Sequence, residues 1–350
     1  MRNKLVISPK TLSLITTYKC TSACKDCCFQ CNPKRPEMLH PIDMKKIIAE
    51  SCRNFPTIQV VVFTGGECTL LDNDLEDLIS YSHKKSLITR IVTNAHWAVT
   101  YEKAFEKLKK LKSAGLNEIN YSTGDDHCKF VPLDYISNAC RASLDLDMIT
   151  IVNFESAPDR TLTVSALTNR CELKPYLSNF KKNSLQIISG EWMPFKKSTE
   201  KKMISHSHGD KHFVVKGQQR CSTLFNTITI DPNYHMIACC GLTAEYNKYL
   251  DLGCVKSNSL KTLYEQQFND LVKIWLYTEG AVPIMKFISN KLKLQKPFMN
   301  PNSHMCQICE KIFNEPQYLN TIKDSYKDIY GTILFKYCFL KKIENTDKEK

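Results

Sequence analysis

Short apolar segments alternate with segments of helical periodicity along the first two-thirds of the chain. The apolar segments are rich in β-branched residues and are followed by turn residues, which is typical of strands. They are Leu12–Thr17, Ile58–Thr64, Ile88–Thr93, Glu118–Ser122, Met148–Asn153 and Leu185–Ser189. The segments of helical periodicity are Ile42–Arg53, Leu75–Lys84, Tyr101–Ala114, Leu133–Leu144 and Leu162–Arg170. Six β/α repeats predict an α/β fold with a parallel sheet, whose functional loops lie at the carboxyl ends of the strands.

The periodicity fades between Ser189 and Arg220. Glu191–Lys202 contains a proline and a run of lysines, which indicates a linker or a lid. Three histidines follow, and they form either a metal site or a polar loop: His206, His208 and His212. Beyond them, the alternating segment Thr227–Ile230 and the turn Asp231-Pro-Asn233 predict a β-hairpin.

Three cysteines with C-x3-C-x2-C spacing lie directly after the first predicted strand: Cys20, Cys24 and Cys27. Three thiolates from one short loop can hold three corners of a [4Fe–4S] cluster, which leaves the fourth iron open for chemistry. Zinc usually takes four ligands in two close pairs, and this spacing differs from that pattern. Disulfides are disfavoured because nothing before Cys20 resembles a secretory signal peptide.

The second predicted strand runs into Thr64-Gly65-Gly66-Glu67. Two glycines let the backbone approach a ligand closely, and Glu67 adds a carboxylate. Taken alone, these four residues are more typical of a tight turn that carries a surface glutamate.

The order of these two motifs resembles the radical S-adenosylmethionine (SAM) enzymes. The resemblance implies a partial (β/α)6 TIM barrel in residues 1–200. It also implies that the open iron chelates the amino and carboxylate groups of SAM. An electron from the cluster then cleaves SAM to methionine and a 5'-deoxyadenosyl radical, which abstracts hydrogen from the substrate. Gly65, Gly66 and Glu67 would receive the amino group of SAM.

Small polar residues end the third and fourth predicted strands. By the same resemblance, Asn94 and Ser122 are candidates to bind the ribose and carboxylate of SAM, although ordinary turn and cap chemistry would explain them as well. Asp125-Asp126-His127 would either position substrate or form a local hydrogen-bond network. Asp26 stands where the family often has an aromatic residue near adenine.

A second set of cysteines lies in the C-terminal third: Cys221, Cys239, Cys306 and Cys309. The hairpin would bring Cys221 close to Cys239, and Cys306-Gln-Ile-Cys309 supplies a C-x2-C pair. Four thiolates from two segments suit a second [4Fe–4S] cluster or a zinc ion equally well by spacing. The radical SAM resemblance favours an auxiliary iron–sulfur cluster in a small α+β domain of the SPASM or twitch type, residues 201–350. Cys254 is either a spare thiol or a further ligand.

Adjacent cysteines on a strand point in different directions, so Cys239 and Cys240 rarely ligate one cluster. If Cys239 is the ligand, Cys240 is left as a thiol able to give a hydrogen atom to a carbon radical. Several segments, including Cys27-Cys28-Phe29, Phe63–Glu67, Thr93–Trp97 and Cys239-Cys240, resemble the radical SAM peptide epimerases, which install D-amino acids in ribosomally made peptides. Ala95, where a glycine is usual, and the glycine-free turn at Asp231 depart from that family.

The resemblance implies an isomerase that inverts an α-carbon of a precursor peptide and receives electrons from a flavodoxin or ferredoxin. The runner-up is a radical SAM maturase that forms thioether or carbon–carbon cross-links, and a remote alternative is a non-catalytic zinc or nucleic-acid-binding protein. The chain has 350 residues, a net charge of +12 and an odd count of 17 cysteines, which favours thiolate ligands over disulfides. Because lysines and arginines are scattered along the chain, the positive charge either suits an acidic peptide or has no specific meaning, and nucleic acid is less favoured.

Hydrophobic content is 43%, and no apolar run reaches the length of a membrane span. A cytoplasmic enzyme is therefore expected. Because no domain precedes Cys20, substrate recognition is expected at the barrel mouth and the C-terminal domain.

Overall fold

The computed structural model describes residues 8–156, 160–177, 185–191, 220–294 and 304–346. These residues form two compact units. The barrel unit contains the described residues from 9 to 191 together with Thr229–His235, and the C-terminal unit contains those from 220 to 228 and from 236 onward. The predicted linker or lid, the three histidines and the predicted domain boundary at residue 200 lie outside the described residues, apart from Glu191.

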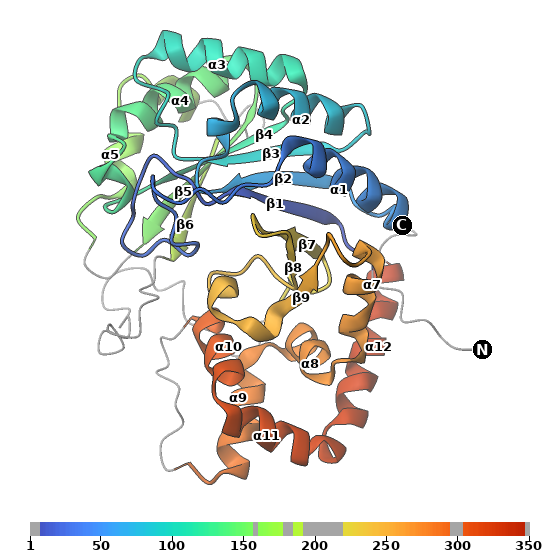
Figure 1. Cartoon of the computed structure of the whole chain (residues 1–350). Helices are drawn as coiled ribbons and strands as arrows, with labels where there is room; N and C mark the ends of the chain where they lie inside the picture. The colour runs from blue at the N-terminus through green and yellow to red at the C-terminus, as the bar shows by residue number, and fades with distance from the viewer. Residues whose placement is uncertain (1–7, 157–159, 178–184, 192–219, 295–303, 347–350) are drawn as a thin grey trace. The chain divides into compact units, whose positions relative to one another are not determined.

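Six parallel strands form the sheet of the barrel unit, in the order of the sequence (Figure 1). They are β1 (Thr11–Thr17), β2 (Val60–Gly65), β3 (Ile88–Thr93), β4 (Glu118–Thr123), β5 (Ile149–Ser156) and β6 (Leu185–Glu191). Because every adjacent pair is parallel, the carboxyl ends of all six strands meet at one edge. The loops that carry the candidate residues are therefore neighbours.

Helices follow the strands and cover one face of the sheet (Figure 1). They are α1 (Pro41–Asn54), α2 (Asn73–His83), α3 (Tyr101–Ala114), α4 (Leu133–Asp145), α5 (Val164–Thr168) and α6 (Lys174–Leu177). Thr100 caps α3 by accepting from the Lys103 N–H, and Gly115 ends it with φ +110°. Of the predicted helices, Leu162–Arg170 differs most, because only Val164–Thr168 is helical and α6 follows separately.

The core of the barrel unit forms where the apolar faces of strands and helices meet. Leu12, Leu14, Phe63, Ile91 and Ile119 on the strands are fully buried. Leu78 on α2 and Leu108 on α3 are fully buried as well. Burial of such side chains contributes about 1.5–3 kcal/mol each, so the sheet provides a rigid support for the loops at its edge.

Three short strands and a set of helices follow in the chain, and the first two of these strands are divided between the two units because Thr229–His235 belongs to the barrel unit (Figure 1). The strands are β7 (Thr227–Ile230), β8 (His235–Ile237) and β9 (Asp251–Cys254). The longer helices are α7 (Leu260–Glu265), α8 (Leu271–Glu279), α9 (Ala281–Lys291), α10 (Met305–Asn314), α11 (Pro316–Asp324) and α12 (Tyr330–Thr346). Buried aromatic rings hold them together, with Phe225 stacked 5.1 Å from Phe268 and Tyr277 6.0 Å from Tyr337. The predicted fold class, an α/β partial barrel followed by a small α+β domain, is confirmed.

The turn between β7 and β8 is built without glycine. The Asp231 carboxylate accepts hydrogen bonds from the backbone N–H groups of Asn233 (2.9 Å) and His235 (2.7 Å), which makes an Asx-type turn. Tyr234 takes the left-handed backbone conformation, with φ +66°. Within the described residues, no helix is both long enough and apolar enough to cross a membrane.

Candidate active site

The cysteine loop, residues 20–32, begins directly after β1 and folds back on itself. Cys20 is buried, and Cys24 and Cys27 are half-buried. The Cys20 N–H donates to the Asn32 carbonyl (3.2 Å) and the Asn32 N–H donates to the Tyr18 carbonyl (3.3 Å), so the two ends of the loop pair with each other. Within it, the Ser22 N–H donates to Cys20 Sγ and the Cys31 N–H donates to Cys27 Sγ, both at 3.4 Å. Such N–H donors stabilise thiolates and tune bound iron–sulfur groups.

The three thiols lie close enough to change one another's pKa. Burial, with smaller contributions from Glu67 and Cys27, raises the pKa of Cys20 to about 11. Burial also raises the pKa of Cys24, with added contributions from Asp126, Cys27 and Cys20. The hydrogen bond from Cys31 lowers the pKa of Cys27 to about 6. A cationic metal would favour the thiolate at all three positions, since metal ligation deprotonates thiols.

The turn Gly65-Gly66 presses against the base of the cysteine loop. The Gly66 N–H donates to the Thr17 carbonyl (2.7 Å), and the Glu67 N–H donates to the Lys19 carbonyl (2.9 Å). A Cβ atom on Gly66 would lie 2.1 Å from the Lys19 carbonyl oxygen, which leaves no space for any side chain. The glycines therefore fix the end of β2 against the residue that precedes Cys20.

The Glu67 side chain is fully buried and makes four hydrogen bonds inside the protein. Its Oε1 accepts from the Thr69 N–H (3.1 Å), the Thr69 hydroxyl (2.6 Å) and the Thr93 hydroxyl (2.8 Å). Its Oε2 accepts from the Asn94 N–H (2.8 Å). This carboxylate joins the carboxyl ends of β2 and β3, whereas the sequence predicted that it binds the amino group of SAM; that role stays a prediction.

Asn94 extends this network to the cysteine loop. It is nearly fully buried, and its side-chain amide donates to the Thr21 hydroxyl (3.0 Å), to the Ser22 hydroxyl (3.1 Å) and towards Cys20 Sγ (3.7 Å). The predicted contact of Asn94 with the ribose or carboxylate of SAM stays a prediction. Ala95, the next residue, has φ +58°, a conformation that glycine adopts without cost. This backbone conformation explains why glycine is usual at this position in the peptide epimerases that the sequence resembles.

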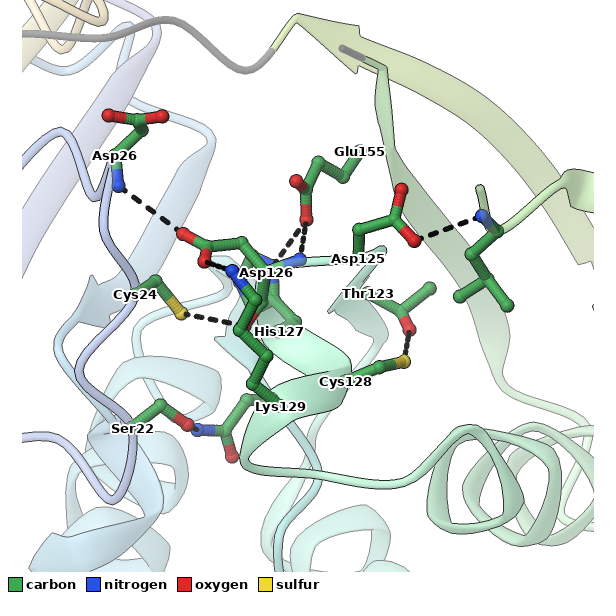
Figure 2. Close-up of polar contacts among 12 residues, drawn as sticks. Ser22, Cys24, Asp26, Thr123, Asp125, Asp126, His127, Cys128, Lys129 and Glu155 are labelled. Carbon is green, nitrogen blue, oxygen red and sulfur yellow. Dashed lines mark hydrogen bonds and ion pairs between the residues drawn. The ribbon is translucent and has the colours of Figure 1, made fainter. Parts of the chain in front are cut away.

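The carboxyl ends of β4 and β5 add two buried carboxylates (Figure 2). Asp126 and Glu155 are each buried, and Lys129 pairs with Asp126 at 2.7 Å. Ser122 is half-buried on β4, in register with Asn153 of β5. Asp26 contributes its backbone N–H to this group rather than its side chain (Figure 2). The sequence did not predict a role for Glu155, although its position near the end of β5 places it at the same edge of the sheet.

The second set of cysteines also gathers in one place. A Cβ atom on Gly241 would lie 3.3 Å from Cys306 Sγ and 3.5 Å from Cys239 Sγ. Burial raises the pKa of Cys309 well above its usual value, and Cys239, Cys221 and Cys306 raise it further. The Thr243 hydroxyl donates to the Cys306 carbonyl (2.9 Å), which attaches α10 to the segment after the hairpin.

The two adjacent cysteines differ in exposure. Cys239 is buried, whereas Cys240 is exposed. Cys254, at the end of β9, is half-buried, and its carbonyl accepts from the Asn258 side chain (3.1 Å). No disulfide joins any of the 17 cysteines, all of which lie in the described ranges.

Both cysteine sets have the donor chemistry of iron–sulfur sites. In the described part of the chain, no group of three or more His, Cys, Asp or Glu side chains is arranged to hold a single metal ion. A cluster differs from a single ion because each thiolate binds a different iron atom, so its ligands stand further apart. Three thiols that influence one another, with N–H donors directed at two of their sulfurs, fit such a group.

Comparison with known proteins supports the fold. No family model matches the chain. The chain is 21% identical to "Putative peptide biosynthesis protein YydG" of Bacillus subtilis (strain 168) over 315 residues, which cover 89% of this chain and 94% of that protein. The solved structure of native anSMEcpe with bound AdoMet has a TM-score of 0.50, with 13% identity and coverage of 93% of this chain and 99% of that one. Native anSMEcpe with AdoMet and the Kp18Cys peptide also gives 0.50, with 12% identity and the same coverage of 93% and 99%.

Proposed function

We propose that this protein is a radical SAM enzyme that modifies a ribosomally synthesised peptide by inverting an α-carbon from L to D. The observation that carries the proposal is the cysteine loop: three mutually interacting thiols at the carboxyl edge of a parallel sheet, attached to a Gly-Gly-Glu turn. The distant relative is described as a peptide biosynthesis protein, and the structure of similar fold binds both AdoMet and a peptide. These descriptions support a peptide substrate.

In this proposal, Cys20, Cys24 and Cys27 hold a [4Fe–4S] cluster that leaves one iron open for SAM. When bound, the cluster and SAM supply a 5'-deoxyadenosyl radical, which removes a hydrogen atom from the substrate. The backbone at Gly65 and Gly66 receives the amino group of SAM, and Asn94 and Ser122 border the remainder of the cofactor. Glu67 supports this site from beneath, because its carboxylate is occupied by Thr69, Thr93 and Asn94.

Cys221, Cys239, Cys306 and Cys309 hold a second, auxiliary [4Fe–4S] cluster in the C-terminal unit. Four buried or half-buried thiols, of which Cys221 and Cys306 raise the pKa of Cys239 and Cys309, provide a full set of ligands. Zinc would use the same four thiolates. Metal analysis of the protein purified and reconstituted without air separates the two, since the proposal requires iron and sulfide at this site.

Cys240 is the proposed hydrogen donor. Cys240 is an exposed residue beside the buried Cys239, and local desolvation raises the pKa of its thiol, which keeps the S–H hydrogen in place while Cys239 serves as a ligand. The S–H bond breaks as a new C–H bond forms on the opposite face of the α-carbon, and Cys240 is left as a thiyl radical. One electron and one proton restore the thiol, and a flavodoxin or ferredoxin is the proposed source of the electron.

The Cys240→Ala variant tests this assignment. We expect it to form 5'-deoxyadenosine with the precursor peptide but to produce no stably inverted residue. In deuterated water the wild-type enzyme should introduce deuterium at each inverted α-carbon, because the thiol exchanges its hydrogen with solvent. Inversion by the variant would exclude Cys240 as the donor.

Two further results would redirect the assignment. A product that has lost hydrogen instead of gaining deuterium would indicate a cross-linking maturase. Cys20→Ala should abolish SAM cleavage; if it did not, the loop would not be the cluster site.

A further inference from the structure

The cysteine loop is held from outside by a residue 100 positions further along the chain. Asp126, which follows β4, accepts the Asp26 N–H on its Oδ2 (3.3 Å). Its backbone carbonyl accepts from the Cys24 thiol (4.0 Å). Both contacts fall on Cys24-Lys25-Asp26, the middle of the loop (Figure 2).

Asp126 is itself fixed by its neighbours. Glu155 at the end of β5 accepts the Asp126 N–H on its Oε2 (2.9 Å), and Lys129 pairs with Asp126 Oδ1 (2.7 Å). Glu155 Oε2 also lies 3.6 Å from His127 Nδ1. Gly124 makes this arrangement possible: its φ is +143°, and a Cβ atom there would lie 2.0 Å from the Glu155 Cβ. A continuous set of contacts therefore runs from β5 through Asp126 to the cysteine loop.

The preceding residue makes different contacts. The Asp125 carboxylate accepts from the Thr161 N–H (2.7 Å), the Thr161 hydroxyl (2.6 Å) and the Leu162 N–H (2.9 Å). Figure 2 shows the two adjacent aspartates directed to opposite sides. Because Asp125 has the same charge and lies one position away, it is a matched control for Asp126.

The three loop cysteines are held in different ways. Cys20 Sγ receives the Ser22 N–H and faces the Asn94 amide, and Cys27 Sγ receives the Cys31 N–H. Cys24 is held through the Asp126 backbone, across to β4. At its middle cysteine the loop therefore contacts the Asp126 backbone, while the Asp126 carboxylate accepts from the nearby Asp26 N–H.

We propose that Asp126, supported by Glu155, is a positioning residue that sets the conformation of the loop around Cys24. The cluster-binding role of that loop rests on the proposed function, whereas the positioning rests only on contacts between protein groups. Loss of the Asp126 carboxylate frees the Asp26 N–H and loosens the turn between Cys24 and Cys27. Cys20 would remain held by Asn94, at the end of β3, and by the Gly-Gly-Glu turn, whose Glu67 N–H donates to the Lys19 carbonyl.

Hydrogen exchange in the metal-free, full-length protein tests the positioning without any cluster. We expect Asp126→Ala to accelerate amide exchange in a peptide spanning residues 22–29 by about fivefold, the equivalent of one hydrogen bond of average strength. Asp125→Ala should leave this peptide within about twofold of wild type, since its contacts lie on Thr161 and Leu162. Asp126→Asn, which keeps an oxygen acceptor for the Asp26 N–H, should fall between the two. Equal exchange in the wild-type and Asp126→Ala proteins, or equal acceleration by both alanine variants, would overturn the proposal.

Iron release to a chelator then tests the link to the cluster. In reconstituted protein, Asp126→Ala should lose iron several-fold faster than Asp125→Ala. If the wild-type protein bound no iron, the proposed function would fail while the exchange result would stand. If Asp126→Ala did not fold cooperatively, Asp126→Asn and Glu155→Gln would carry the comparison, because both preserve side-chain volume.

Discussion

Replacement of Glu67 tests whether its carboxylate supports the site from within or contacts the cofactor directly. The structure assigns it four donors, of which two are backbone N–H groups, on Thr69 and Asn94, that cannot turn to another acceptor. In Glu67→Ala, each buried N–H left without an acceptor costs about 1–3 kcal/mol. We therefore expect a loss of about 4 kcal/mol in the free energy of unfolding, taking both N–H groups together.

Glu67→Gln is the sharper variant because it preserves volume. All four partners donate, so the amide NH2 of glutamine must face a donor in either orientation. One such pair of facing donors lowers the free energy of unfolding by about 2 kcal/mol. Urea denaturation of the metal-free protein, followed by circular dichroism, measures this loss, and Glu106→Gln on the exposed side of α3 is the control, with an expected effect within about 0.5 kcal/mol.

The result that would refute this reasoning is specific. If Glu67→Gln unfolded at the same urea concentration as the wild type but bound SAM more weakly, the carboxylate would face the cofactor rather than the protein interior. If stability fell while the affinity of the folded protein for SAM was retained, the internal role would be supported.

Three other substitutions probe separate parts of the structure. Ala95→Gly should raise the free energy of unfolding by about 1 kcal/mol, measured in urea, because it relieves a left-handed backbone at φ +58°. Lys273→Met should lower the free energy of unfolding by about 2 kcal/mol, measured by thermal denaturation. The substitution removes a buried ion pair with Asp270 (2.7 Å) and a contact over the Tyr249 ring (4.3 Å). Cys306→Ser should reduce iron content by about four atoms per chain while SAM cleavage persists, if it removes an auxiliary cluster.

Much of the barrel unit could be predicted because its elements obey local rules. Ile88–Thr93 and Tyr101–Ala114 have the predicted bounds, the latter because Thr100 and Gly115 supply both caps. The prediction of one helix over Leu162–Arg170 was wrong. Only Leu167 is buried on α5, so this segment has no full apolar face to pack against the sheet. Local periodicity is informative where a segment buries a full face, and much less so elsewhere.

The contacts of the candidate residues could not be predicted, because they join segments distant in sequence. The motif identifies Glu67, but only the fold brings Thr93 and Asn94 to its carboxylate. Similarly, the sequence places Asp126 at the sheet edge without revealing that it reaches Asp26. Sequence identifies the chemistry available at the edge, while parallel strand packing determines which groups meet there.

The Asx turn at Asp231 has a consequence for the choice between the adjacent cysteines 239 and 240. The two hydrogen bonds that the Asp231 carboxylate accepts, from the Asn233 and His235 N–H groups, fix the number of residues between β7 and β8. Cys239 and Cys240 follow β8 by two and three residues, and insertion of a single residue in this turn is expected to exchange which of the two is buried. If Cys239 is a cluster ligand and Cys240 the hydrogen donor, as proposed, the length of this turn would decide which cysteine takes which role.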